Sequence, residues 1–242
     1  MRFRIKYSKG GQAVFLGHLD MLRLWQRAMR RAGLPLAYSH GFNPHPLLAF
    51  GPALAVGIES RAEYLDGELT TPLEPAVLKD RLQAQLPAGL EIRQVFTIPR
   101  QAPSLTAIIN AAAYRVTWED PPDPKSLKEK AKDFLSRPAV EVNRRGKDGV
   151  KARDIRPGVY QLVVTPEAAL EMLLECSSRG NVRPEEVVRA MDLEDPLRVI
   201  RTGLFNRRDD NRILAPEELA DARYMTPARG DSALHEKVEI GE

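Results

Sequence analysis

The chain has 242 residues, of which 43% are hydrophobic and 29% are charged, so it can bury one large core or two ordinary ones. Its single cysteine, Cys176, excludes an intramolecular disulfide and any zinc or iron-sulfur site made only of cysteines from this chain. The net charge of +3 excludes a uniformly basic protein, so the distribution of charge along the sequence matters more than its sum.

The N-terminal sequence MRFRIKYSK alternates charged and apolar residues and has no continuous apolar core, unlike a secretory signal. No run approaches the roughly 18 apolar residues that a membrane span requires. We therefore expect a cytoplasmic protein with no membrane partner.

The first hundred residues predict a strand, a helix, two strands, a helix and a strand, in the ranges 3–7, 20–33, 47–58, 63–70, 75–86 and 90–98. Asp20 is expected to cap the first helix and Gly33 to end it, because glycine tolerates left-handed dihedral angles. Gly51, Pro52 and Gly57 should make the strand over 47–58 irregular.

The second half repeats this order with one additional hairpin. Strands are predicted over 114–118, 160–165, 170–176 and 197–205, helices over 125–136 and 184–191, and the hairpin over 140–144 and 150–153. We therefore predict an α+β fold of two tandem ferredoxin-like (βαββαβ) units with antiparallel sheets, at residues 1–100 and 104–205. Residues 206–242 have little apolar periodicity and predict a mostly extended or disordered tail, with one helical turn over 216–221.

The first helix has an apolar side and a basic side. Arg23, Arg27 and Arg30 recur at helical spacing, and Arg31 lies beside them. Residues 1–50 contain eight basic side chains and one acidic one, a net charge of +7 against +3 for the whole chain. Such a stripe is often an ordinary solvated face, but this local excess of cations favours a phosphate-bearing partner.

The loop at 39–46 follows this helix, and its prolines hold Asn43 and His45 in extended geometry. Together with His40, these two residues are candidates for reading or stacking on an unpaired base. Two other chemistries remain open: a metal site made of His18, Asp20, His40 and His45, or a general base, His18 or His45, acting on an RNA 2′-hydroxyl. A protein-docking surface or a purely structural loop is also compatible with the pattern.

Two further features have ordinary explanations. Basic residues around the predicted hairpin extend the phosphate-contacting surface or form a solvated turn, and they are Arg144, Arg145, Lys147, Lys151, Arg153 and Arg156. Cys176 ends a predicted strand and is expected to be a buried thiol.

The segments FLGHLDMLRLWQRAMRRAGLP and SHGFNPHP resemble the radical-SAM-linked family of unknown function, which occurs beside or fused to cobalamin-binding-type radical SAM proteins in bacteria. The resemblance covers most of residues 1–205. Its specific residues are His18, Leu19, Asp20, Arg27, Arg30, Arg31, Gly41, Phe42, Asn43, Pro44, His45 and Pro46. The chain lacks the three cysteines of a radical SAM cluster, so the resemblance implies an accessory module with a radical SAM protein as its partner.

These observations predict an RNA-binding accessory module that helps a partner radical SAM enzyme act on structured RNA, either rRNA or tRNA. We expect no cofactor and no activity of its own, and no preference for DNA is inferred. One alternative is an RNA-processing, endonuclease-like or metal-dependent enzyme that uses His18 or His45. Another is a non-enzymatic protein-docking adaptor.

Overall fold

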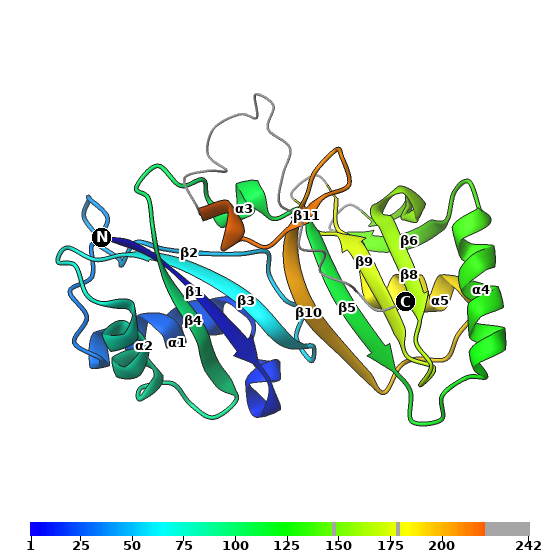
Figure 1. The fold of residues 1–242 in the computed structure, drawn as a ribbon, viewed down its shortest axis with the longest axis horizontal. Coiled ribbons are helices and arrows are strands. Elements are labelled where there is room, and N and C mark those ends of the chain that lie inside the picture. Colours follow the sequence, from blue (N-terminus) through cyan, green and yellow to red (C-terminus); the bar gives the residue numbers. More distant parts are fainter. Residues whose placement is uncertain (147–148, 178–179, 221–242) are drawn as a thin grey trace, which may run out of the picture.

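A computed structural model describes residues 1–146, 149–177 and 180–220. It is a mixed α/β fold built on one nine-stranded, mostly antiparallel sheet with the strand order β4-β1-β3-β10-β5-β9-β8 (Figure 1). Two short strands lie off this path, because β2 pairs with β3 and β11 pairs with β10. No helix within the described ranges is long and apolar enough to cross a membrane.

The first half contains every helix and strand predicted for it, with changed boundaries. They are β1 (Arg2–Lys9), the 3-10 turn η1 (Gly11–Phe15), α1 (His18–Arg31), β2 (Leu48–Phe50), β3 (Glu59–Glu68), α2 (Pro75–Gln83) and β4 (Leu90–Ile98). The irregular strand is reduced to three residues. The strand ends at Phe50, directly before Gly51 and Pro52. Farther along, Gly57 has a φ of +89°, which a regular strand does not adopt.

The ends of α1 have identifiable causes. The helix begins at His18, two residues before the predicted start, and Asp20 is not its N-cap. Its carboxylate instead accepts a hydrogen bond from the Gly17 N–H at 3.3 Å, which satisfies a donor before the first turn. Gly33 has a φ of +62°, so its predicted role at the helix end is confirmed.

The second half also follows the predicted order, including the additional hairpin. Its elements are α3 (Leu105–Ile108), β5 (Ala111–Thr117), α4 (Pro124–Ser136), β6 (Glu141–Gly146), β7 (Gly149–Asp154), η2 (Arg156–Gly158), β8 (Val159–Val164), β9 (Leu170–Glu175), α5 (Pro184–Ala190), β10 (Arg198–Arg207), β11 (Ile213–Leu214) and η3 (Glu218–Ala220). The hairpin β6-β7 forms its own two-stranded sheet.

The sheets of the two halves are continuous instead of separate. The last long strand, β10, pairs antiparallel with β5 of its own half and parallel with β3 of the first half. The parallel pairing spans only Ile200 with Glu59 and Arg201 with Ser60. Farther along β3, the short strand β2 takes the same edge and pairs at Leu48–Phe50. The junction between the halves is therefore narrow.

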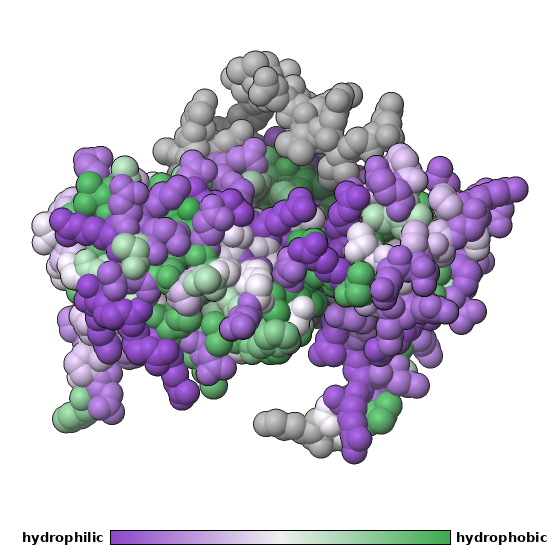
Figure 2. Space-filling model, turned by 90° about the horizontal axis from the view of Figure 1, so that it is seen from below, coloured by the Kyte–Doolittle hydropathy of each residue, from purple (hydrophilic) through white to green (hydrophobic). Residues whose placement is uncertain are grey.

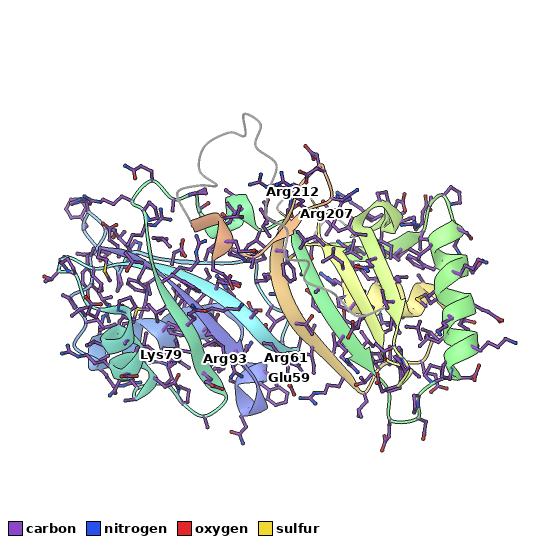
Figure 3. All side chains as sticks on the ribbon, in the orientation of Figure 1. Glu59, Arg61, Lys79, Arg93, Arg207 and Arg212 are labelled. Carbon is purple, nitrogen blue, oxygen red and sulfur yellow. The ribbon has the colours of Figure 1, made fainter. Side chains whose placement is uncertain are left out.

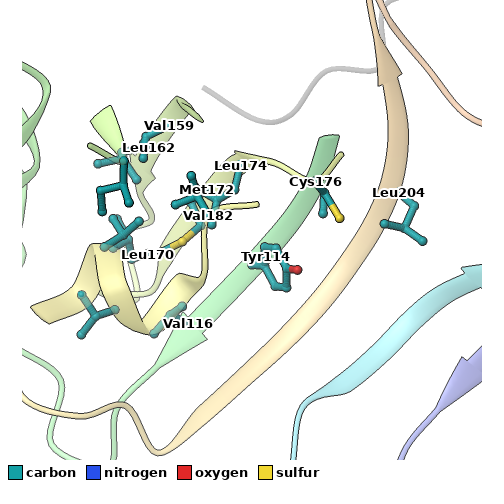
Figure 4. Packing of buried hydrophobic residues seen from close by; sticks show 14 of the residues in the cluster. Tyr114, Val116, Val159, Leu162, Leu170, Met172, Leu174, Cys176, Val182 and Leu204 are labelled. Atoms are coloured by element: carbon teal, nitrogen blue, oxygen red, sulfur yellow. The ribbon is translucent and has the colours of Figure 1, made fainter. Parts of the chain in front are cut away.

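Each half has its own apolar core. In the first half, Phe3, Ile5 and Tyr7 alternate along β1 and belong to the same buried cluster as Trp25 of α1 and Leu78 of α2. In the second half, Tyr114, Met172 and Cys176 lie in a second cluster (Figure 4). Cys176 is 4% exposed, which confirms the prediction of a buried thiol.

The other face of β1 is polar and covered. Arg4 is buried and donates to both carboxylate oxygens of Asp66, at 2.7 and 3.0 Å, and to the carbonyl of Pro216 at 2.8 Å. Glu217 accepts from Lys6 Nζ at 2.7 Å and from the Tyr64 hydroxyl at 2.6 Å. Residues 213–220, expected from the sequence to be part of an unpacked tail, therefore contact the sheet. Residues 221–242 of that tail lie outside the described residues.

Candidate functional site

The basic face of α1 is present and faces solvent. Arg23, Arg27 and Arg30 are exposed and form no hydrogen bond or ion pair with any described residue. Arg31 differs, because its guanidinium donates to the carbonyl of Gln85 at 2.7 Å and to Gln85 Oε1 at 3.3 Å. Three of the four predicted arginines are therefore free to bind an external anion.

The cations of β1 do not join this face. Arg2 and Arg4 pair with Asp66, and Lys6 pairs with Glu217. Lys9 is 3% exposed and donates to the carbonyl of Leu16 at 2.8 Å. The excess of +7 counted in residues 1–50 thus overstates the charge that a partner can meet, because carboxylates from later in the sequence neutralise part of it.

The loop at 39–46 is held closed by its own polar groups. The Ser39 N–H donates to the carbonyl of His45 at 2.9 Å, and the His45 N–H donates to Ser39 Oγ at 3.1 Å. His45 Nδ1 lies 3.0 Å from the same hydroxyl, so one edge of this ring is already used. His40 and Asn43 are exposed, and their side chains form no hydrogen bond with the described part of the chain.

The predicted metal set is not brought together. The rings of His18 and Phe50 pack nearly perpendicular to each other, with their centroids 5.6 Å apart. Asp20 accepts from the Gly17 N–H, and His45 contacts Ser39. Across residues 1–146, 149–177 and 180–220, no group of three or more His, Cys, Asp or Glu side chains could hold a metal ion. These residues therefore supply no metal-binding geometry.

Instead, His18 lines a small cavity of mixed apolar and polar character that the sequence did not suggest. The cavity has a volume of about 20 Å³, room for about one water molecule. Its lining consists of Tyr7, Lys9, Leu16, His18, Met21, Phe50, Gly51, Pro52, Ala53, Leu54, Glu63 and Tyr64. It brings an imidazole, an ammonium and a carboxylate from three different elements to one place beside the junction of the halves.

A buried ion pair supports this cavity from the second half. Arg201 is 2% exposed, and its Nη1 donates to both carboxylate oxygens of Glu63, at 3.0 and 3.2 Å. The same guanidinium donates to the hydroxyl of Tyr114 and to the carbonyls of Pro52 and Ala53. It therefore fixes the loop after β2 against both halves of the sheet.

The electrostatics of this cluster follow from burial and from the ion pair. Burial lowers the pKa of Lys9 and, more strongly, raises that of Tyr7. Burial is the largest single influence on Arg201 and opposes its charge, but Glu63, Tyr114 and Cys176 together raise the pKa of this guanidinium above its usual value. β3 is buried over residues 62–67 and β10 over residues 200–201, so alternation along these strands does not single out Glu63 or Arg201.

Part of the positive charge of the basic hairpin is paired within the chain. Arg144 pairs with Glu186 and with the carbonyl of Asn181, and Arg156 donates to the carbonyls of Leu135 and Val159. Lys151 also has an interaction within the chain, and Lys147 lies outside the described residues. Arg145 and Arg153 form no hydrogen bond or ion pair with any described residue, so this surface is only partly bound internally.

Comparisons with known proteins place the sequence but not its activity. Residues 2–184 match the family described as "Uncharacterized protein conserved in bacteria (DUF2344)". No curated protein matches the chain. A solved structure titled "Crystal Structure of a Cbf5-Nop10-Gar1 Complex" is similar over 92% of this chain, with 12% identity and a TM-score of 0.42. This chain spans 55% of that structure's chain.

Proposed function

The chain belongs to the bacterial family DUF2344, and we propose its function from its own surface. The chain is an RNA-binding accessory module that helps a partner radical SAM enzyme act on structured RNA, either rRNA or tRNA. The observation that carries this proposal is the unpaired basic face of α1, defined as Arg23, Arg27 and Arg30.

This face differs from several other basic positions on the molecule, whose side chains have partners within the chain. Figure 3 marks Arg93, Arg207 and Arg212, and each has an internal partner: Glu91, Asn211 and Asp210, respectively. The arginines of α1 have none among the described residues, so they retain their full capacity to bind phosphate. The 1.5 Å rise of a helix spreads them over about 10 Å, a length that several adjacent phosphates of one strand would occupy.

The sequence from the basic face of α1 through the following loop carries no acidic side chain. Residues 21–58 contain neither Asp nor Glu, so the basic face and the loop after it form one segment without a carboxylate. Much of the surface in Figure 2 is hydrophilic, with apolar patches separated by polar residues. A polar surface with local positive charge is typical of nucleic-acid interfaces.

The partner follows from the resemblance to radical-SAM-linked proteins and from the cysteine content. With one cysteine, the chain cannot itself bind a cluster that needs three.

We also propose that each half is a ferredoxin-like unit. The main sheet supports this. In the first half the strands lie in the order β4-β1-β3-β2, and in the second half, leaving out the separate hairpin β6-β7, in the order β10-β5-β9-β8. Numbered along the sequence within each half, both orders are fourth, first, third, second, as in a ferredoxin-like unit.

The test is a salt titration of RNA binding by the full chain. Replacing Arg23, Arg27 and Arg30 with Ala should weaken binding and reduce the slope of log affinity against log salt by about 2, since each lost phosphate contact contributes roughly 0.7–0.9. A matched control removes the same charge from α4, where Lys125, Lys128 and Lys132 are also exposed without a partner among the described residues.

The control variant should keep the slope of the unaltered protein. Equal losses in both variants would reject a specific basic face, and no RNA binding at low salt would reject the function. Co-purification of a radical SAM protein without RNA binding would instead favour the adaptor.

The cavity gives a second candidate function, an RNA-processing enzyme that uses His18. His18 shares the cavity with Lys9 and Glu63, whereas His45 is bound to Ser39 and faces no carboxylate in the described structure. An RNA cleavage assay comparing His18→Ala with His45→Ala distinguishes the two histidines. Cleavage that His18→Ala leaves unchanged would remove this residue from catalysis.

A further inference from the structure

The tip of the loop at 39–46 carries an aromatic ring with almost no contact to the rest of the protein. Phe42 is 106% exposed, so folding buries none of its side chain. Tyr38, at the base of the same loop, is 41% exposed. Large apolar side chains gain free energy by burial, and a ring left this bare is available to a partner.

The loop that presents Phe42 is held at its base. A bridge pairs Tyr38 with Pro46, and the Leu47 N–H donates to the carbonyl of Ala37 at 2.9 Å. The Ala37 N–H in turn donates to the carbonyl of Glu68 at 2.9 Å, which ties the loop to the end of β3. Together with the contacts between Ser39 and His45, these bonds lower the entropy that is lost when the ring binds a partner.

The neighbours of Phe42 indicate the chemistry of that partner. His40, Asn43 and His45, which flank Phe42 in the loop, are exposed and polar, so hydrogen-bonding groups lie on both sides of the ring in the sequence and could contact the edges of a base. Flat aromatic rings, free amide and imidazole groups and unpaired arginines, here on the helix that precedes the loop, are the groups that bind unpaired nucleotides.

We propose that Phe42, supported by Tyr38, is a stacking platform for an unpaired base, so that the chain selects single-stranded or looped RNA over a continuous duplex. This inference rests on the proposed RNA-binding function and names its substrate class. In this proposal, the arginines of α1 bind the phosphate backbone of the RNA, and Phe42 binds a base that is free to stack on it. Paired bases within a helix already stack on their neighbours and present no face to the ring.

The experiment measures binding of the full chain to a labelled single-stranded RNA of about twelve nucleotides and to a duplex of the same length. Phe42→Ala should weaken single-strand binding roughly 5- to 150-fold, the range expected for one stacked base, without changing the salt dependence. Phe42→Tyr should restore it. Duplex binding should change less than about twofold.

The control is Phe15→Ala, because Phe15 is also largely exposed, at 71%, but lies in η1 outside the loop. It should leave both affinities unchanged. In Phe42→Trp, stacking should quench the fluorescence of the new indole when the single strand binds.

Single-strand binding that Phe42→Ala leaves intact would overturn this inference while the RNA-binding function stands. Equal weakening of single-strand and duplex binding would also overturn it. Failure of the unaltered chain to bind any RNA would overturn both.

Discussion

Replacing Arg201 with Met should destabilise the protein strongly, because the change leaves the carboxylate of Glu63 buried without its partner. Breaking one side of a buried ion pair typically costs about 3–5 kcal/mol. For a chain of this size, that loss lowers the unfolding midpoint by roughly 6–20 °C. Urea unfolding followed by circular dichroism measures the loss in the free energy of unfolding.

A neighbouring ion pair on the same two strands provides the control. Arg198 pairs with Glu59, but these side chains are 53% and 32% exposed, whereas those of Arg201 and Glu63 are 3% and 7% exposed. Arg198→Met should therefore cost less than about 1 kcal/mol. The combined Arg201→Met and Glu63→Met variant should lose less than Arg201→Met alone, since it buries no unpaired charge. Equal effects of Arg201→Met and Arg198→Met would refute this reasoning.

Three further predictions concern buried groups. Burial, the largest cause in each case, raises the pKa of Tyr7, Tyr64 and Tyr114, so these rings should stay protonated above pH 10. Their contribution to stability is lost as pH rises further, and absorbance at 295 nm should show them ionising only with alkaline unfolding. Because the pKa of Lys9 is lowered, the stability of the unaltered chain relative to Lys9→Met should rise with pH up to about 10.5, measured by urea unfolding; a flat difference would contradict it. Glu217→Gln should cost about 1–3 kcal/mol, because Tyr64 loses a charged acceptor; an unchanged urea midpoint would contradict this.

Local patterns in the sequence predicted local structure well. The alternation of residues 3–7 predicted a strand of the central sheet, and the spacing of Arg23, Arg27 and Arg30 predicted an exposed helical face. Both depend on the fixed periods of strands and helices, which are properties of short segments. The shortened β2 was also foreseeable, because glycine and proline interrupt it.

Contacts between distant segments were not predictable in this way. Arg4 meets Asp66 and Pro216, which lie 62 and 212 residues away. Nothing in residues 1–50 reveals that Asp66 and Glu217 neutralise the positive charges of β1. The count of charges in one segment was therefore a poor measure of its electrostatic field. The polar cluster at the cavity was missed for the same reason, since Lys9 and Glu63, which line the cavity, and Arg201, which pairs with Glu63, come from three separate strands.

The narrow pairing of β3 with β10 has a consequence for how the protein folds. Arg198 and Glu59, which lie on these two strands, are 139 residues apart, so joining them closes a very long loop. Such contacts form late and slowly, because chain entropy must be lost before the contact returns any stability. A growing chain on the ribosome therefore keeps the edges of β3 and β5 open until its last long strand has emerged, and chaperones have most reason to protect it during that interval.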